Sequence, residues 1–167
     1  MTKQITQFFA MLLFVLLGLG GTTRAQTFTL NTTTGSTPVF TNSNGSGTVT
    51  FNFENNSGGP IKITAIEGVT GTAGSQSAAL WIKTSGPING APGAISVANG
   101  WTLAASGTFV GVSNTTTTVT QTFLSGLAVT IPAGANYGMA VSAYNGTTGT
   151  QRYYFTGTTM PTTTFTA

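Results

Sequence analysis

The chain has 167 residues, of which only 4% are charged, and it contains no cysteine and no histidine. An average soluble domain carries charge on roughly 25% of its residues. Without histidine there is no imidazole to activate a serine or cysteine nucleophile or to bind zinc or copper. Without cysteine the fold cannot depend on disulfide bonds. The composition therefore excludes histidine-based catalysis and the small disulfide-framed modules of secreted proteins.

Residues 1–25 predict a secretory signal peptide. A polar start with Lys3 precedes an unbroken apolar run of twelve residues from Phe8 to Leu19, and small residues follow it. Twelve residues of helix span about 18 Å, which is less than the roughly 30 Å core of a bilayer and argues against an uncleaved anchor. We therefore expect cleavage before Gln26 and a secreted protein, extracellular or attached to the cell surface.

Removal of the signal changes the charge balance. The mature chain of 142 residues keeps two acidic and three basic residues, a net charge of +1, and the basic ones are Lys62, Lys83 and Arg152. Nucleic-acid binding requires several phosphate contacts, which three scattered cations do not supply. We expect no nucleic-acid partner and no membrane span in the mature chain.

Alternating segments of apolar and polar residues recur along the mature chain, separated by turn residues. In chain order, the expected strands are 26–31, 47–55, 61–66, 79–84, 101–112, 116–123, 127–131, 137–144 and 152–156. The Gly- and Pro-bearing turn at 56–60 predicts that 61–66 returns as the partner of 47–55. A parity slip near Ile66 predicts a bulge, and a break is expected at Ser106-Gly107. Asn145-Gly146 predicts a hairpin turn.

About eight to ten short strands without a crossover helix predict an all-β fold, an antiparallel β-sandwich or jelly roll. The length suits one domain, which we place at residues 26–157. The Thr-rich segment 158–167 is interpreted as an edge strand or a linker. A long loop is expected at 87–100.

One part of the chain is similar to a known module. The segments Leu80-Trp81-Ile82-Lys83-Thr84, Trp101-Thr102-Leu103 and Ile131-Pro132-Ala133-Gly134-Ala135-Asn136-Tyr137-Gly138 resemble β-sandwich modules in large secreted and cell-surface proteins of Gram-negative bacteria. The resemblance covers about half of the mature chain. It implies a bacterial β-sandwich unit without an assigned catalytic residue.

The acidic residues offer little catalytic chemistry. Glu54 and Glu67 are the two carboxylates of the whole sequence. A glycosidase needs two carboxyl groups beside the cleaved bond, whereas a cross-strand ion pair between Lys62 and Glu54 is the simpler interpretation. Calcium prefers several hard oxygens, mostly carboxylates, so a site of carbonyl and Asn oxygens would be weak. We expect no enzymatic activity, no catalytic residue, no metal site and no cofactor.

The aromatic residues suggest a glycan platform. Trp81 is out of phase with Leu80 and Ile82, so it should lie on the opposite strand face, beside Lys83. Exposed Trp and Tyr rings combine an apolar face with a polar group, which suits stacking against sugars. The candidate glycan-binding residues are Trp81, Lys83, Tyr144, Tyr153 and Tyr154, and the alternative is that an aromatic ring covers a strand end. Trp101 and Tyr137 are expected in the core.

The predicted new N-terminus suggests a second activity. It alternates, carries no charge and consists of Gln26, Thr27, Phe28, Thr29, Leu30 and Asn31. Such an arm can add as a strand to a neighbouring subunit, or pair with its own sheet. Natural sheets protect their edges with charge, proline or bulges, and this chain has few charges.

These observations together predict a non-enzymatic, exported structural or adhesive protein of the cell surface or extracellular matrix. Its partners would be copies of itself, joined into a fibre by strand donation from the N-terminus, or surface glycans and matrix. A glycan-binding module is the alternative function, and a secreted hydrolase ranks last.

Overall fold

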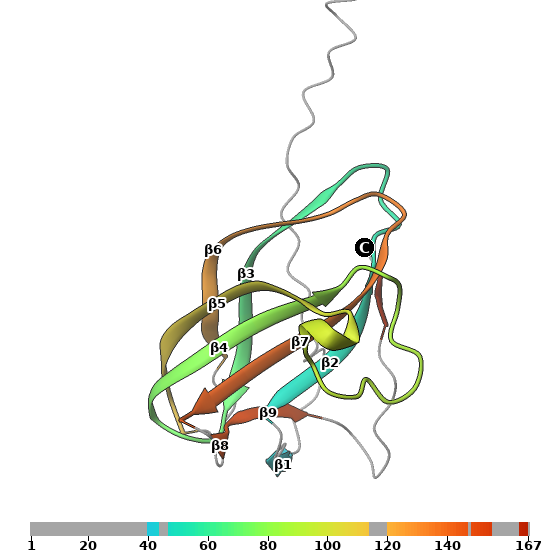
Figure 1. Ribbon diagram of the computed structural model, residues 1–167. Coiled ribbons are helices and arrows are strands. Elements are labelled where there is room, and N and C mark those ends of the chain that lie inside the picture. Colours follow the sequence, from blue (N-terminus) through green and yellow to red (C-terminus); the bar gives the residue numbers. More distant parts are fainter. Residues whose placement is uncertain (1–39, 44–46, 114–119, 147, 155–163, 167) are drawn as a thin grey trace, which may run out of the picture. The chain divides into compact units, whose positions relative to one another are not determined.

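The computed structural model describes residues 40–43, 47–113, 120–146, 148–154 and 164–166. Over these residues the protein is an all-β sandwich of two packed sheets, as the alternating sequence predicts (Figure 1). The strands are β1 (Phe40–Ser43), β2 (Thr48–Glu54), β3 (Ile61–Thr70), β4 (Gly74–Lys83), β5 (Thr102–Gly111), β6 (Gln121–Ile131), β7 (Asn136–Asn145), β8 (Thr148–Gly149), β9 (Gln151–Tyr154) and β10 (Thr164–Thr166). A short 3-10 helix, η1 (Val97–Asn99), lies in the loop between β4 and β5.

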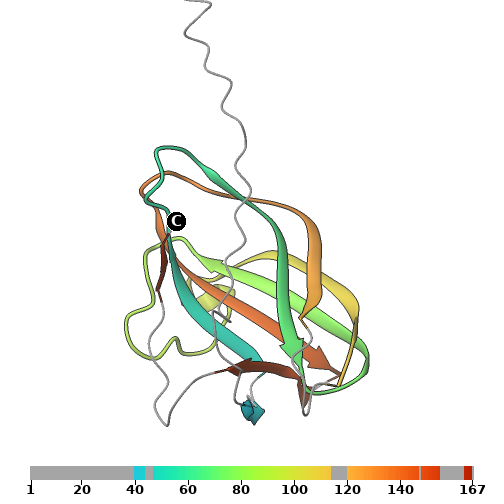
Figure 2. The ribbon, with the colours of Figure 1, turned by 180° about the vertical axis from the view of Figure 1, so that it is seen from behind.

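Each of the two sheets combines strands that are distant in the sequence. The smaller sheet has the order β1-β9-β3-β6 and the larger one the order β10-β2-β7-β4-β5, with β8 paired to β7 (Figure 2). The pairs within the described residues are antiparallel, except that β10 runs parallel to β2. The expected strands 116–123 and 127–131 overlap one continuous strand, β6.

The pairing predicted for the 61–66 segment is wrong. β2 pairs with β7 and β10, whereas β3 pairs with β6 and β9 in the other sheet. The turn at 56–60 does reverse the chain, but it carries the chain across from one sheet to the other. A turn signal reports a change of direction and says nothing about which sheet the next strand joins.

Of the two strand irregularities predicted from the sequence, one is confirmed and the other is wrong. The register of β3 against β6 shifts between Ile63 and Ala65 and again between Ile66 and Glu67, which confirms a bulge near Ile66. The break expected at Ser106-Gly107 does not occur, because β5 pairs regularly with β4 there. The shift in β5 lies between Leu103 and Ala105 instead.

The core lies between the sheets, where inward side chains of β2, β4, β6 and β7 meet. Its buried members are Phe53, Ala78, Leu80, Ile82, Phe123, Leu124, Ile131, Met139, Val141 and Ala143. Tyr137 packs against this cluster while partly buried, and Trp101 is 1% exposed just before β5. Trp101 is thus buried as predicted, whereas Tyr137 lies at the margin of the core.

Asn55 ties two turns together at one end of the sandwich. Its side chain is fully buried, and Nδ2 donates to the carbonyl oxygens of Gly59, Ile131 and Pro132, each at 3.0 Å. Its Oδ1 accepts from the N–H and the hydroxyl of Ser57. These bonds join the β2–β3 turn to the start of the β6–β7 turn, and the two turns lie together at the top of Figure 1. A buried amide with its donors and acceptor all engaged stabilises one geometry.

Candidate functional site

The outer face of the larger sheet carries the first predicted site residues. Trp81 lies opposite Ala140 of β7 on one side and opposite Leu103 of β5 on the other. Leu80 and Ile82 are buried in the core, while Trp81 is half-buried on the outer face. The predicted orientation of Trp81 is therefore confirmed.

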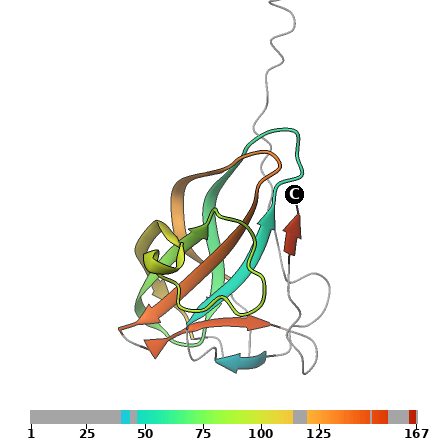
Figure 3. The ribbon, with the colours of Figure 1, turned by 45° about the vertical axis from the view of Figure 1, so that its right-hand side comes forward.

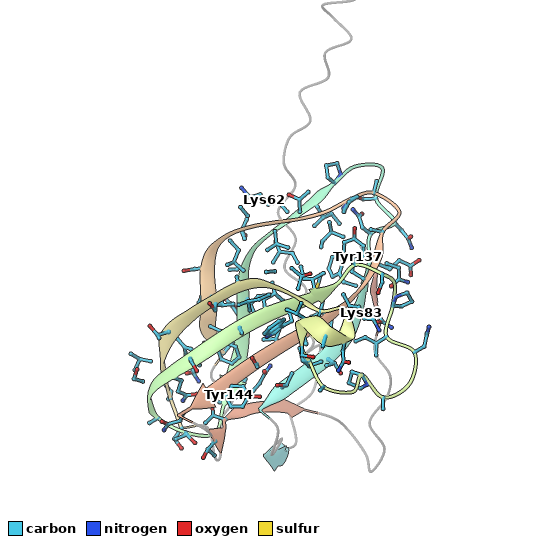
Figure 4. All side chains as sticks on the ribbon, viewed as in Figure 1. Lys62, Lys83, Tyr137 and Tyr144 are labelled. Carbon is cyan, nitrogen blue, oxygen red and sulfur yellow. The ribbon has the colours of Figure 1, made fainter. Side chains whose placement is uncertain are left out.

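Lys83 lies two residues along β4, on the same outer face. It is opposite Gly138 of β7, and the register of β2 places Asn52 opposite Gly138 on the other side. Lys83 is partly buried, and its aliphatic stem lies 3.4 Å from the position that a Cβ on Gly138 would take. Lys83 and Trp81 are thus neighbours on the outer face of β4, with Lys83 at the end of the strand (Figure 4).

Tyr144 lies on the same face but at the other end of β7. It is opposite Ser77 of β4, four residue positions from the row of Trp81. At about 3.3 Å per residue the two aromatic residues are roughly 13 Å apart along the strands. The hydroxyl oxygens of Tyr144 and Thr48 are 3.0 Å apart, a hydrogen bond that fixes the ring beside the start of β2.

The last two candidates lie on another sheet. Tyr153 and Tyr154 belong to β9, which pairs with β1 and β3 in the smaller sheet, and their side chains lie outside the described residues. The structure therefore brings Trp81, Lys83 and Tyr144 onto one face and places Tyr153 and Tyr154 on a strand of the other sheet. The expected donor strand, Gln26–Asn31, lies outside the described residues.

A loop that sequence reasoning assigned no role folds over part of this outer face. Residues 84–100 return across β7 and β2, as Figure 3 shows from the side. The backbone N–H of Gly138 donates to Gly86 O at 3.2 Å, and the Asn52 side chain holds the backbone of Ile88. The loop leaves the ring of Trp81 half-buried and the far half of the face uncovered.

The uncovered half of the face is polar without being charged. The outward residues of β4 and β5 there include Ser75, Ser77, Ser106 and Thr108, all exposed. Hydroxyl groups both donate and accept hydrogen bonds, so they suit hydroxyl-bearing ligands or extended backbones. Val110, which is 76% exposed, is the next outward residue of β5 after Thr108.

The opposite end of the sandwich holds a neutral polar cluster. Gln121 accepts the N–H of Val112 at 2.7 Å and donates to Thr70 Oγ1 at 3.3 Å. The Gln76 side chain donates to the carbonyl of Thr72 and accepts from the hydroxyl of Thr150. These side chains bond one another and nearby backbone, so the cluster serves to position strand ends.

The two carboxylates are not brought together by a hairpin. Glu54 lies on β2 opposite Asn136, and Glu67 lies on β3 opposite Thr122 in the other sheet. Lys62 is opposite Thr130, so the expected cross-strand pair between Lys62 and Glu54 does not form. Within the described part of the chain no three His, Cys, Asp or Glu residues gather to hold a metal ion.

Comparisons with protein-family models, with curated proteins and with solved structures find no match. Among the residues that the structure describes, no helix has the length and apolar character needed to cross a bilayer.

One hollow opens between the sheets. It has a volume of about 310 Å³ and is lined by residues 106–109 of β5 and by residues 122–125 and 127 of β6. The rings of Phe109 and Phe123 lie beside one another with their centroids 4.6 Å apart. The hollow contains no charged group, so its chemistry is apolar contact and backbone or hydroxyl hydrogen bonding.

Proposed function

We propose that the protein is a non-catalytic structural or adhesive protein, exported to the cell surface or the extracellular matrix and able to assemble with copies of itself. The observation that carries the proposal is the edge of the larger sheet at β5. From Ala105 to Gly111 this edge strand is paired regularly with β4 and has neither charge nor proline. Edges of natural sheets usually carry such protection, because an unprotected edge pairs with another chain.

The neutral surface supports the same proposal. The uncovered half of the outer face of the larger sheet presents hydroxyls where most soluble proteins present ions. Two subunits with such surfaces bring almost no charge into contact, so their association avoids both repulsion and the cost of desolvating ions. Assembly of this kind depends on backbone pairing and apolar contact, and should be nearly insensitive to salt.

Sedimentation velocity of the exported, purified chain tests the proposal. We expect the mean sedimentation coefficient to rise with protein concentration, by the same amount at low and at high salt, and electron micrographs to show oligomers or fibres. A single monomeric species at every concentration would contradict self-assembly. Labelling of intact cells with an antibody against the mature chain tests the location, and signal confined to the cell interior would contradict export.

Glycan binding is the second candidate, and the placement of Trp81 and Tyr144 on one outer face supports it. Stacking of a sugar on Trp81 would require the ring itself. Binding on a glycan array should therefore be lost in Trp81→Ala and largely kept in Trp81→Phe. Leu103→Ala is the matched control, because Leu103 is the exposed apolar neighbour in the same row. A blank array for the unmodified chain, or equal loss in Leu103→Ala, would contradict this function.

A further inference from the structure

Two unpaired edges lie next to one another on one side of the sandwich. Within the residues that the structure describes, β5 pairs with β4 alone and β6 pairs with β3 alone, so each is the last strand of its sheet. The two strands lie on the same side of the molecule in all three ribbon views. The N–H and C=O groups that point away from the neighbouring strand are available to an added strand.

The β5 edge is the better acceptor of the two. The seven residues from Ala105 to Gly111 face Leu80 to Gly74 without a shift of register. In β6 the register against β3 shifts twice, and Gly126 takes a positive φ of 66°. Bulges interrupt the row of hydrogen-bonding groups that an added strand needs. A strand of at least six residues therefore finds a continuous partner on β5 and an interrupted one on β6.

The hollow between the edges has room for side chains of such a strand. Gly107 and Phe109 face inward on β5, because they lie opposite the buried Ala78 and Gln76. Gly107 has no side chain, and Leu124 packs close against it, because a Cβ at Gly107 would lie 3.2 Å from Leu124 Cδ2. A cavity of about 150 Å³ holds a benzene ring in a protein of known structure. The hollow of about 310 Å³ can therefore take one or two apolar side chains.

We infer that the β5 edge and this hollow receive residues 26–31 of a second copy of the chain. The inference rests on the proposed self-assembly and names the surface that receives the donated strand. Phe28 and Leu30 alternate with Thr27 and Thr29, the spacing at which side chains of a strand enter one side of a sheet. In this arrangement the side chains of Phe28 and Leu30 enter the hollow. The side chains of Thr27 and Thr29 lie on the outer face, beside the hydroxyl groups of β4 and β5.

The charge and the length of the N-terminal segment agree with its role as the donated strand. Residues 26–31 carry no charged side chain, and neither do β5 and β6, so docking buries no ion. Fourteen residues, 26–39, precede β1. A fully extended chain of that length spans at most about 46–50 Å, which is enough to reach a neighbouring molecule. The arm thus has the composition and the reach for β-augmentation.

Disulfide trapping tests the inference, because the natural chain has no cysteine to interfere. One chain carries Thr29→Cys, and a second carries Ser106→Cys or Thr108→Cys, two exposed outward positions on β5. Opposed side chains on neighbouring strands have Cβ atoms about 4.5–5.5 Å apart, close to what a disulfide requires. We expect a mixture of the two chains, under a mild oxidant, to give a crosslinked heterodimer. The control acceptor is Thr64→Cys, an exposed threonine on β3, which should give none.

The outcomes separate the inference from the function on which it rests. Equal crosslinking at Thr64→Cys, or no crosslinking at β5, overturns the acceptor site. A crosslink that forms within a chain carrying both cysteines, but never between chains in the mixture, shows that the arm pairs with its own β5 and overturns the second copy as occupant. If unmodified chains still assemble in the ultracentrifuge, the proposed function survives either result. If they never assemble, self-assembly and the acceptor site fail together.

Discussion

The side chain of Asn52 and the backbone of Ile88 form two reciprocal hydrogen bonds. The N–H of Ile88 donates to Asn52 Oδ1 at 2.7 Å, and Asn52 Nδ2 donates to Ile88 O at 3.2 Å. The side-chain amide of Asn52 thus donates to and accepts from one backbone residue of the loop, as a residue of a neighbouring strand does. The Ile88 side chain packs where Gly138 has no Cβ, since an added Cβ would lie 2.7 Å from Ile88 Cγ1.

Loss of this pair should release the loop. In Asn52→Ala the N–H and C=O of Ile88 lose their partner, and we expect the free energy of unfolding to fall by about 1–2 kcal/mol. We also expect faster proteolytic cleavage within residues 84–100. Urea unfolding and mapped limited proteolysis measure the two effects. Thr50→Ala, on the same face of β2, is the control, and equal cleavage in both variants would contradict the role of Asn52.

Asn55 should be the more costly position of the two. Asn55→Ala removes the Nδ2 donor from the buried carbonyl of Ile131 and from the carbonyls of Gly59 and Pro132, and removes the acceptor of the Ser57 N–H. The carbonyls of Gly59 and Pro132 keep the Ser57 hydroxyl and the Ala135 N–H as donors. We expect the free energy of unfolding to fall by at least about 2 kcal/mol, measured by urea denaturation. The neighbour Asn56 is exposed, so Asn56→Ala should have little effect. Similar losses in the two variants would show that the buried network does not matter.

Gly68 should not tolerate a side chain. A Cβ at this position in β3 would overlap the ring of Phe123, which is buried in the core. Overpacking of this kind costs about 1–3 kcal/mol of stability. Gly58→Ala is the matched control, because nothing lies within 4 Å of a Cβ placed there. Thermal unfolding of the two variants compares the costs, and an unchanged melting temperature for Gly68→Ala would refute the packing argument.

Stability should depend little on acidity. The chain has two carboxyl side chains and no histidine, so few groups can bind protons differently in the folded and unfolded states. We expect the urea midpoint to change only slightly between about pH 7 and pH 4. Measurement of the midpoint across that range checks this expectation. A steep loss on acidification would require a proton-linked group that the composition does not provide.

Strand faces could be predicted from the sequence because alternation is a local signal. It placed Trp81 on the strand face opposite that of Leu80 and Ile82, and the structure agrees. Strand partners could not be predicted in the same way. β2 lies beside β7 because Phe53 and Val141 fill one core from adjacent strands, and no local pattern connects segments so far apart.

The same limit applies to the candidate site. The outward direction of Trp81 and Lys83 follows from parity within β4, whereas the cover provided by residues 84–100 depends on Asn52, which lies 36 residues from its partner Ile88. Tyr153 and Tyr154 are included among the candidate glycan-binding residues because of their residue type, and their strand belongs to the other sheet.

The order in which the strands enter the two sheets has a consequence for when the chain can fold. Strands near the end of the described chain pair with strands near its start: β9 lies between β1 and β3, and β10 lies beside β2. Neither sheet is complete until almost the whole chain is present. Pairings between distant segments form slowly. The polypeptide therefore acquires its final shape only after its last strands have followed the first.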